Sequence, residues 1–256
     1  MKLRLFNPES NLYRFAEWVQ RLVYVNLLWI LFSLVGLVIF GFTPATVAMF
    51  SIIKKWIRGQ ENVAIFKNFW NVYKANFIKA NILGITLGII GFILYFDIQF
   101  FKAQEGILNF FLYYAVLVAS FLYLIVLLYV FPIFVNYDLK LYHVIKNSLL
   151  ISILSPLQTL MMIGGMVGLY FAFMLLPSLL PFLSGSTLAF VIMWVSLKSF
   201  AKVEQKIRDH KQEDPEPEKE NEDTGEDEDK AIEDQEKEKK KEKEKKEEKE
   251  EKPKTE

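Results

Sequence analysis

The chain has 256 residues, no cysteine and two histidines, which excludes disulfides and thiolate chemistry and argues against a histidine-based metal site. Its formal net charge of zero averages two different regions. Residues 1–201 carry 14 Lys/Arg and 6 Asp/Glu, a net charge of +8, whereas residues 202–256 carry 16 and 24, a net charge of −8. The first region is rich in Phe, Leu, Ile and Val, and the second has almost no apolar residue with which to bury a core. We therefore predict an all-α protein, with a polytopic membrane helical bundle over 1–201 and a disordered, low-complexity charged tail over 202–256.

The first apolar run, residues 22–53, contains 32 residues without a charge, which is typical of membrane-embedded helices. Thr43 is suited to cap a helix and Pro44 to begin one, so we expect helices over about 22–41 and 44–58. These two segments form either a hairpin or one broken span. Basic residues dominate both flanks and mark the cytoplasmic side, so we favour a hairpin that turns at Phe42–Pro44 and leaves both flanks inside.

Residues 1–21, ahead of this run, have apolar side chains on one helical face. They are expected either to form a short amphipathic helix on the cytoplasmic membrane surface or to extend the first helix into water.

Residues 62–79 are predicted to form an amphipathic helix with aromatic residues on one face and basic residues on the other. The aromatic stripe consists of Phe66, Phe69, Trp70, Tyr73 and Phe77. Such a helix suits the surface of an anionic lipid leaflet. Nucleic-acid-binding segments have a similar composition, but we disfavour nucleic-acid binding next to membrane spans.

The next span is expected over about 79–96. Gly84, Gly88 and Gly91 give it a small-residue face that lets another helix approach closely. The loop that follows contains Asp97 and Glu105 and suits the outside of the cell.

Two longer uncharged runs complete the membrane domain. The first predicts a span over about 107–135, with Pro132 near its end. The second, residues 147–197, has room for helices over about 148–176 and 181–200. Gly164, Gly165 and Gly168 form a second small-residue face. The total is about six membrane-embedded helices, with both termini inside.

The tail divides into two parts by composition. Residues 213–229 contain 11 acids and one lysine and are expected to be disordered. Residues 230–256 contain 11 lysines and 11 acids, and Glu–Lys pairs four residues apart would support a solvated helix. We favour the alternative of a solvated low-complexity tail without a specific partner.

Ionisable side chains in the middle of membrane helices are functional candidates by default, but Asp97, Glu105 and Asp138 all stand at the ends of predicted spans. Proton-coupled pumps, voltage sensors and carboxylate-bound ion paths are therefore disfavoured. We expect neither an enzyme nor a site for a cofactor or metal. The polar residues of the spans are expected to form hydrogen bonds between helices rather than to bind substrate. They are Asn26, Ser33, Thr86, Ser120, Ser152, Ser155, Gln158 and Thr159.

Short motifs occur in a fixed order over about residues 1–200: NLLW at 26–29, PAT at 44–46, KKWIRG at 54–59, YVFP at 129–132 and PSLLPFL at 177–183. In this combination they resemble the YesL-like family of bacterial integral membrane proteins. The motif positions, to which the family assigns no role, are Asn26, Trp29, Pro44, Ala45, Thr46, Lys55, Trp56, Gly59, Pro132 and Pro181. Family members carry a basic residue shortly after the Phe-Pro pair, where this chain has Val135 and Asn136. The resemblance implies a multi-pass protein of the bacterial cell membrane that is linked to carbohydrate utilisation.

Two functions stay open at this level. The first is an accessory protein for carbohydrate or oligosaccharide uptake, with the lipid bilayer and a sugar permease or other membrane protein as partners. The alternative is a membrane-anchored adaptor that acts through the charged tail or the basic, aromatic segment 62–79 and transports nothing.

Overall fold

The computed structural model describes residues 11–60, 62–137 and 139–213, and every regular element in this part of the chain is a helix. The helices are α1 (Asn11–Val35), α2 (Ile39–Ile57), α3 (Ile65–Lys102), α4 (Ile107–Asn136), α5 (Leu141–Leu154), α6 (Pro156–Leu175), the 3-10 helix η2 (Pro177–Leu179) and α7 (Leu180–Glu213). The described residues up to Lys206 form one compact unit, and the last residues of α7 belong to a second. The predicted disorder and the Glu–Lys helix of the tail fall on 214–256, outside the described residues.

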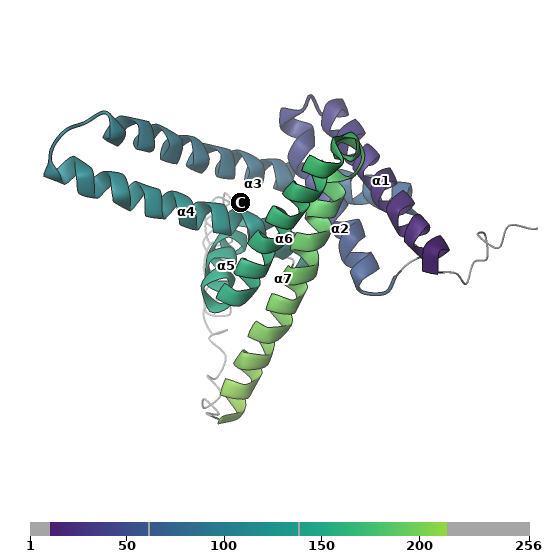
Figure 1. Cartoon of the computed structure of the whole chain (residues 1–256). Coiled ribbons are helices and arrows are strands. Elements are labelled where there is room, and N and C mark those ends of the chain that lie inside the picture. The colour runs from purple at the N-terminus through teal and green to yellow at the C-terminus, as the bar shows by residue number, and fades with distance from the viewer. Residues whose placement is uncertain (1–10, 61, 138, 214–256) are drawn as a thin grey trace, which may run out of the picture. The chain divides into compact units, whose positions relative to one another are not determined.

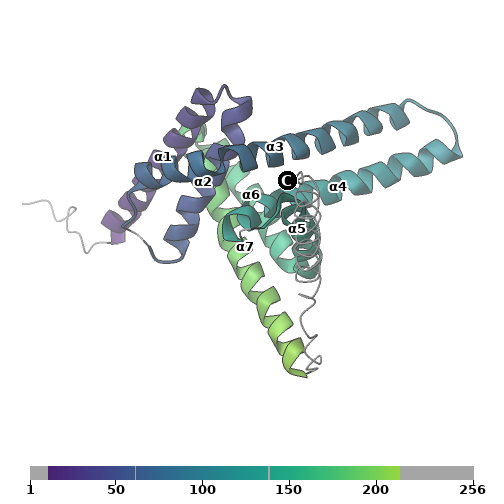
Figure 2. The same ribbon diagram turned by 180° about the vertical axis from the view of Figure 1, so that it is seen from behind.

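Helix α2 is the centre of the first unit and contacts α1, α3 and α4. Figures 1 and 2 show α1 and α2 folded back on each other, with α3 running past them. The buried side chains of α2 are mostly small or apolar, and they include Ala45, Val47, Ala48, Ile52 and Ile53. Small residues let neighbouring helices approach closely where no hydrophobic effect drives helices together.

The hairpin between α1 and α2 exists, but its predicted turn at Phe42–Pro44 is wrong. The chain turns at residues 36–38, and Pro44 lies inside α2. Gly36 and Gly41 explain the earlier turn, because a Cβ on either glycine would overlap the backbone of the other limb. The turn also places Leu37 and Val38 at φ angles of 57° and 63°, a left-handed conformation that costs a non-glycine residue on the order of 1–3 kcal/mol.

Helix α3 joins two segments that were predicted separately, the surface helix over 62–79 and the span over 79–96. Two members of the aromatic stripe are buried in the protein rather than facing lipid: Phe69 and Tyr73 lie 5.3 Å and 5.2 Å from the ring of Phe32 on α1. The Tyr73 hydroxyl also donates a hydrogen bond to the Phe32 carbonyl (3.3 Å). The stripe therefore fixes α3 to α1, and only its outer members Phe66 and Trp70 are exposed.

Later boundaries differ from the predictions where proline acts. Helix α4 matches the predicted 107–135, whereas the predicted helix 148–176 is two helices, because Pro156 begins α6 and Ser155 separates it from α5. Proline has no backbone N–H, so it is well tolerated at the start of a helix. The last predicted helix, 181–200, extends instead to Glu213. At the other end of the chain, α1 is unbroken from Asn11, which matches the extension of the first helix rather than a separate surface helix.

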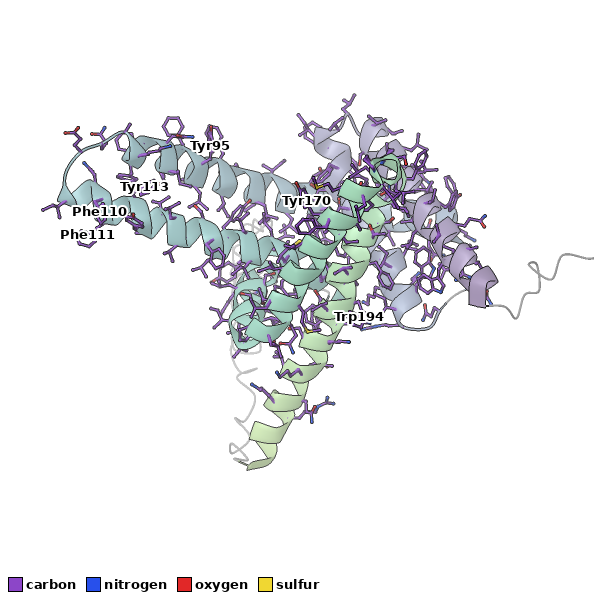
Figure 3. All side chains as sticks on the ribbon, in the orientation of Figure 1. Tyr95, Phe110, Phe111, Tyr113, Tyr170 and Trp194 are labelled. Carbon is purple, nitrogen blue, oxygen red and sulfur yellow. The ribbon has the colours of Figure 1, made fainter. Side chains whose placement is uncertain are left out.

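Five helical segments of the described residues are long and apolar enough to cross a membrane: Ala16–Val35, Ile65–Lys102, Ile107–Asn136, Pro156–Leu175 and Pro177–Lys206. Helix α2 is not among them. The apolar surface faces outward, as Figure 3 shows for Tyr95, Phe110 and Phe111 at the far end of the α3–α4 pair and for Tyr170 on α6. The chain is therefore a membrane protein built as a helical bundle, as predicted.

Candidate functional site

Four of the ten motif positions meet where α1, α2 and α7 pack. Asn26 is fully buried on α1, and its amide connects that helix to α7. The Asn26 Nδ2 donates to the Pro181 carbonyl (2.9 Å), and its Oδ1 accepts from the Ser186 backbone N–H (3.1 Å). Gly185 makes room for this contact, since a Cβ there would lie 2.8 Å from the Asn26 Oδ1. One buried amide thus satisfies both its donor and its acceptor on a single neighbouring helix.

The second polar contact connects α1 to α2. The Trp29 Nε1 donates to the Thr46 Oγ1 (3.0 Å), and Thr46 in turn donates to the Phe42 carbonyl (2.7 Å). Pro44, which has no N–H to donate within the helix, lies between Phe42 and Thr46. Together with Asn26, these residues form a polar network that fixes three helices and leaves no charge inside.

The other six motif positions are distributed over the bundle. Lys55 donates to the Asn68 Oδ1 (2.5 Å) and ties α2 to α3. Trp56 lies edge-on to Trp18, with ring centroids 5.9 Å apart. Gly59 adopts a φ of 84° after α2, where a side chain would be strained. The remaining three, Pro44, Ala45 and Pro132, are buried inside helices.

Among the other predicted polar positions, Thr159 alone makes a side-chain bond to another helix within the described residues, with the Tyr129 hydroxyl (3.0 Å). Thr86, Ser120 and Ser152 instead bond to backbone carbonyls of their own helices. The expectation of interhelical hydrogen bonds is thus correct for Asn26 and Thr159 and wrong for these three, because a short hydroxyl reaches the carbonyl three or four residues earlier more easily than a neighbouring helix. It is also wrong for Ser33, Ser155 and Gln158, whose buried side-chain oxygens have no hydrogen-bond partner among the described residues.

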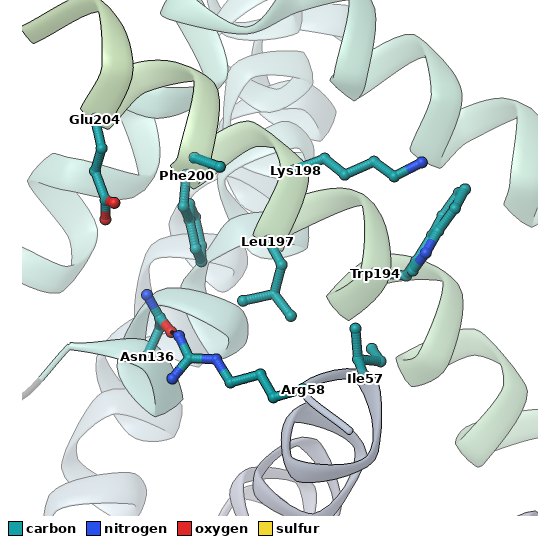
Figure 4. A pocket seen from close by; sticks show the side chains of 9 residues that line it. Ile57, Arg58, Asn136, Trp194, Leu197, Lys198, Phe200 and Glu204 are labelled. Atoms are coloured by element: carbon teal, nitrogen blue, oxygen red, sulfur yellow. Dashed lines mark hydrogen bonds between the residues drawn. The ribbon is translucent and has the colours of Figure 1, made fainter. Parts of the chain in front are cut away.

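A pocket of about 400 Å³ lies at the ends of α2 and α4 and against α7. Figure 4 shows its lining, in which Arg58 approaches Asn136, whereas Lys198 extends from α7 toward Trp194 and away from Arg58; Glu204 also extends from α7. The Arg58 guanidinium donates to the Asn136 Oδ1 (2.8 Å). The apolar part of the lining is Ile57, Trp194, Leu197, Phe200 and Ala201. The pocket therefore combines a cationic edge with an apolar wall.

Cations at this junction also cap the end of α4. The Lys54 amine donates to the Val135 carbonyl (2.9 Å) in the last turn of that helix, where backbone carbonyls have no partner within the helix and the dipole is negative. Burial, and secondarily the positive charge of Arg58, lowers the pKa of Lys54 from its usual value. The positive charges of Lys54 and Arg58 therefore lie close enough to repel each other at the end of α4.

The carboxylate of the pocket is engaged by a tyrosine. The Tyr137 hydroxyl donates to the Glu204 Oε1 (2.7 Å), which connects the end of α4 to α7. Burial, reinforced by this hydrogen bond and by the charge of Glu204, raises the pKa of Tyr137 to about 12. The phenol therefore stays protonated and holds Glu204 in place at neutral pH.

The sequence is similar to one family model and to three proteins of a bacterium. The model of a family described as "Protein of unknown function, DUF624" matches residues 22–98. Three Bacillus subtilis (strain 168) proteins match over most of their length: YteU is 40% identical over 77% of this chain and 88% of its own, YesV 37% over 75% and 93%, and YesL 34% over 82% and 99%. This chain belongs to the YesL-like family. The three relatives are each described as an uncharacterised protein, and no solved structure matches the chain.

Most of the YesL-like motif positions lie inside the bundle, although Gly59 and Pro181 are exposed, whereas the pocket was not predicted. Arg58 stands inside the KKWIRG motif, but Lys198 and Glu204 lie near the end of the last candidate span, outside the motifs, and Asn136 follows the Phe-Pro pair. They meet only because α2 and α4 end beside α7. The basic residues at the ends of the apolar runs were the one signal in the sequence that could have placed these residues at the same depth relative to the membrane.

Proposed function

We propose that this protein is a non-catalytic accessory component of oligosaccharide uptake in the bacterial cell membrane, and that it acts by packing beside a sugar permease. The resemblance to YesL-like proteins supports the link to carbohydrates. The observation that carries the packing role is the outer surface of α6, which offers another membrane helix a face that the described part of the chain leaves open.

Helix α6 is the least buried of the candidate spans, since only 11% of the residues in its most apolar stretch are buried. A Cβ on Gly164 or on Gly168 would meet no atom within 4 Å, although one on Gly165 would lie 2.6 Å from Val191 of α7. Gly164 and Gly168 are four residues apart, so they lie on one face, and this spacing favours close packing of membrane helices. The two glycines therefore let a partner helix approach α6 more closely than larger residues at these positions would.

The test is co-purification from the native membrane with a tagged permease. Leucine at both Gly164 and Gly168 should remove the permease from the purified protein, because the larger side chains prevent close approach. Gly88→Leu on α3 is the matched control, since Gly88 also has open space around it and should retain the permease. A deletion strain should grow poorly on one polysaccharide. Normal growth on every glycan together with no permease contact would refute the proposal.

A second candidate is an adaptor that transports nothing, and the exposed part of the α3 stripe favours it. Phe66 and Trp70 are exposed, and the Lys74 amine lies 4.9 Å from the centre of the Trp70 ring. An adaptor working through this surface should lose its partner when both aromatic residues are replaced by serine. One working through the tail should lose its partner when 214–256 are deleted. The accessory protein described above should retain its permease in both variants.

A further inference from the structure

The pocket between α2, α4 and α7 has the composition of a site for an amphipathic anion. Two cations line it, Arg58 and Lys198, against one carboxylate, Glu204. The remainder of the lining is largely apolar and includes an indole ring, Trp194, that is 41% exposed. Its volume of about 400 Å³ falls within the range of small-molecule sites.

Both cations have donors to offer. Among the described residues the ion pair within 4 Å is Arg21–Glu17, so neither Arg58 nor Lys198 is in direct contact with a carboxylate there. Arg58 makes a hydrogen bond to the neutral Asn136 amide, and a guanidinium has five N–H donors in a fork that matches two phosphate oxygens. The Lys198 amine rests 3.3 Å from the centre of the Trp194 ring, a contact that a flexible lysine can exchange for an anion.

The position of the pocket along three helices corresponds to the membrane boundary. The apolar run of α2 ends at Lys54, that of α4 ends at Asn136, and that of α7 ends at Lys198. Phosphate groups of phospholipids lie at this level, directly outside the hydrocarbon. A lipid whose phosphate enters the pocket would place its acyl chains against the apolar side of α7.

We propose that this pocket binds the phosphate of an anionic phospholipid, with Arg58 and Lys198 as the phosphate ligands and Trp194 and Leu197 beside the acyl chains. Two cations against Glu204 leave one net positive charge, which matches the single negative charge of a phosphodiester headgroup such as phosphatidylglycerol. Trp194 and Leu197 add contacts that only a ligand with acyl chains can make, so the site favours a lipid over inorganic phosphate. This site is independent of any role in carbohydrate uptake.

Trp194 provides a direct readout. The full-length protein is reconstituted in phosphatidylcholine vesicles that contain brominated phosphatidylglycerol or, in parallel, brominated phosphatidylcholine, and tryptophan fluorescence is recorded. The chain has five tryptophans, so the signal from Trp194 is the difference between the wild type and Trp194→Phe. That difference should show quenching at a lower mole fraction of brominated phosphatidylglycerol than of brominated phosphatidylcholine. Equal quenching by the two lipids would overturn the proposal.

Charge variants test the ligands. Each cation near an anionic surface contributes roughly a fivefold preference, so Arg58→Gln and Lys198→Gln should each reduce the preference for phosphatidylglycerol by about fivefold. Lys102→Gln, which changes an exposed lysine at the C-terminal end of α3 and outside the pocket, should leave the preference for phosphatidylglycerol unchanged. Glu204→Gln keeps an acceptor for Tyr137 and should increase the preference.

Lys198 is exposed at the surface, so its variant should fold even if Arg58→Gln does not. An unchanged preference in Lys198→Gln would refute the assignment. Inorganic phosphate is added to the vesicles as a competitor. Loss of quenching at millimolar phosphate would show a free-anion site instead and overturn the lipid proposal.

Discussion

Replacing the buried amide of Asn26 should loosen α7 from α1. Leucine has the same branched skeleton as asparagine, although its methyl groups are bulkier, and it cannot donate to the Pro181 carbonyl or accept from the Ser186 N–H. Interhelical hydrogen bonds in membrane proteins contribute about 0.6 kcal/mol each on average and about 1.7 kcal/mol at most. The two bonds of Asn26 therefore predict a loss of about 1.2 kcal/mol, with an upper bound of about 3.4 kcal/mol.

The assay is thermal unfolding of the purified protein in a mild detergent. A change of 1 kcal/mol moves the Tm of a domain of 150–250 residues by about 2–4 °C, so Asn26→Leu should lower the Tm by about 2–5 °C. Asn76→Leu is the matched control, because the Asn76 amide donates to the Val72 carbonyl of its own helix (3.1 Å) and joins no second helix. If Asn26→Leu unfolds at the wild-type temperature, or Asn76→Leu loses as much, the amide does not hold α7.

Three further predictions concern the turn, its surroundings and the end of α4. Gly36→Ala should destabilise the protein by roughly 1–3 kcal/mol in the same assay, because its Cβ overlaps the facing backbone, whereas Gly88→Ala, in open space, should be neutral or stabilising. A single cysteine at Val38 should resist membrane-impermeant thiol reagents from both sides, because the turn is apolar and exposed on the protein surface, where lipid would cover it; labelling from outside would place the turn in water. Tyr137→Phe should lower stability by an amount that is constant below pH 10. The difference should vanish between pH 10 and about 12, where the wild type loses the proton that Glu204 accepts as a hydrogen bond, and a difference that changes between pH 6 and 9 would contradict this assignment.

The membrane class and most helices could be predicted from the sequence, because long uncharged runs have few alternatives to a membrane helix. Local signals also failed in a consistent way. Thr43 and Pro44 look like the start of a helix, but the hairpin turns where Gly36 and Gly41 let two backbones touch, and that contact depends on both limbs. Pro156, by contrast, acts locally and does begin a helix.

The candidate sites were harder to predict because they join distant residues. Asn26 and Pro181 are 155 positions apart, and Arg58 and Asn136 are 78 apart. The motif placed Asn26 and Pro181 in one set without indicating that they touch. No periodicity in the sequence specifies which helix ends meet, since helix packing is decided by the shapes of whole faces.

The central position of α2 has a consequence for the order in which the chain is made. Its partner α1 is synthesised first, so the hairpin can insert as a unit while the rest is still on the ribosome. The acceptor of Lys54, the Val135 carbonyl, follows 81 residues later. Until that part of α4 has been translated, the Lys54 ammonium is best solvated by water and lipid headgroups, and it holds the growing hairpin at the bilayer surface. When α4 is complete, the Val135 carbonyl replaces the water around the Lys54 ammonium. The final depth of α2 then depends on a helix that is made only after the hairpin.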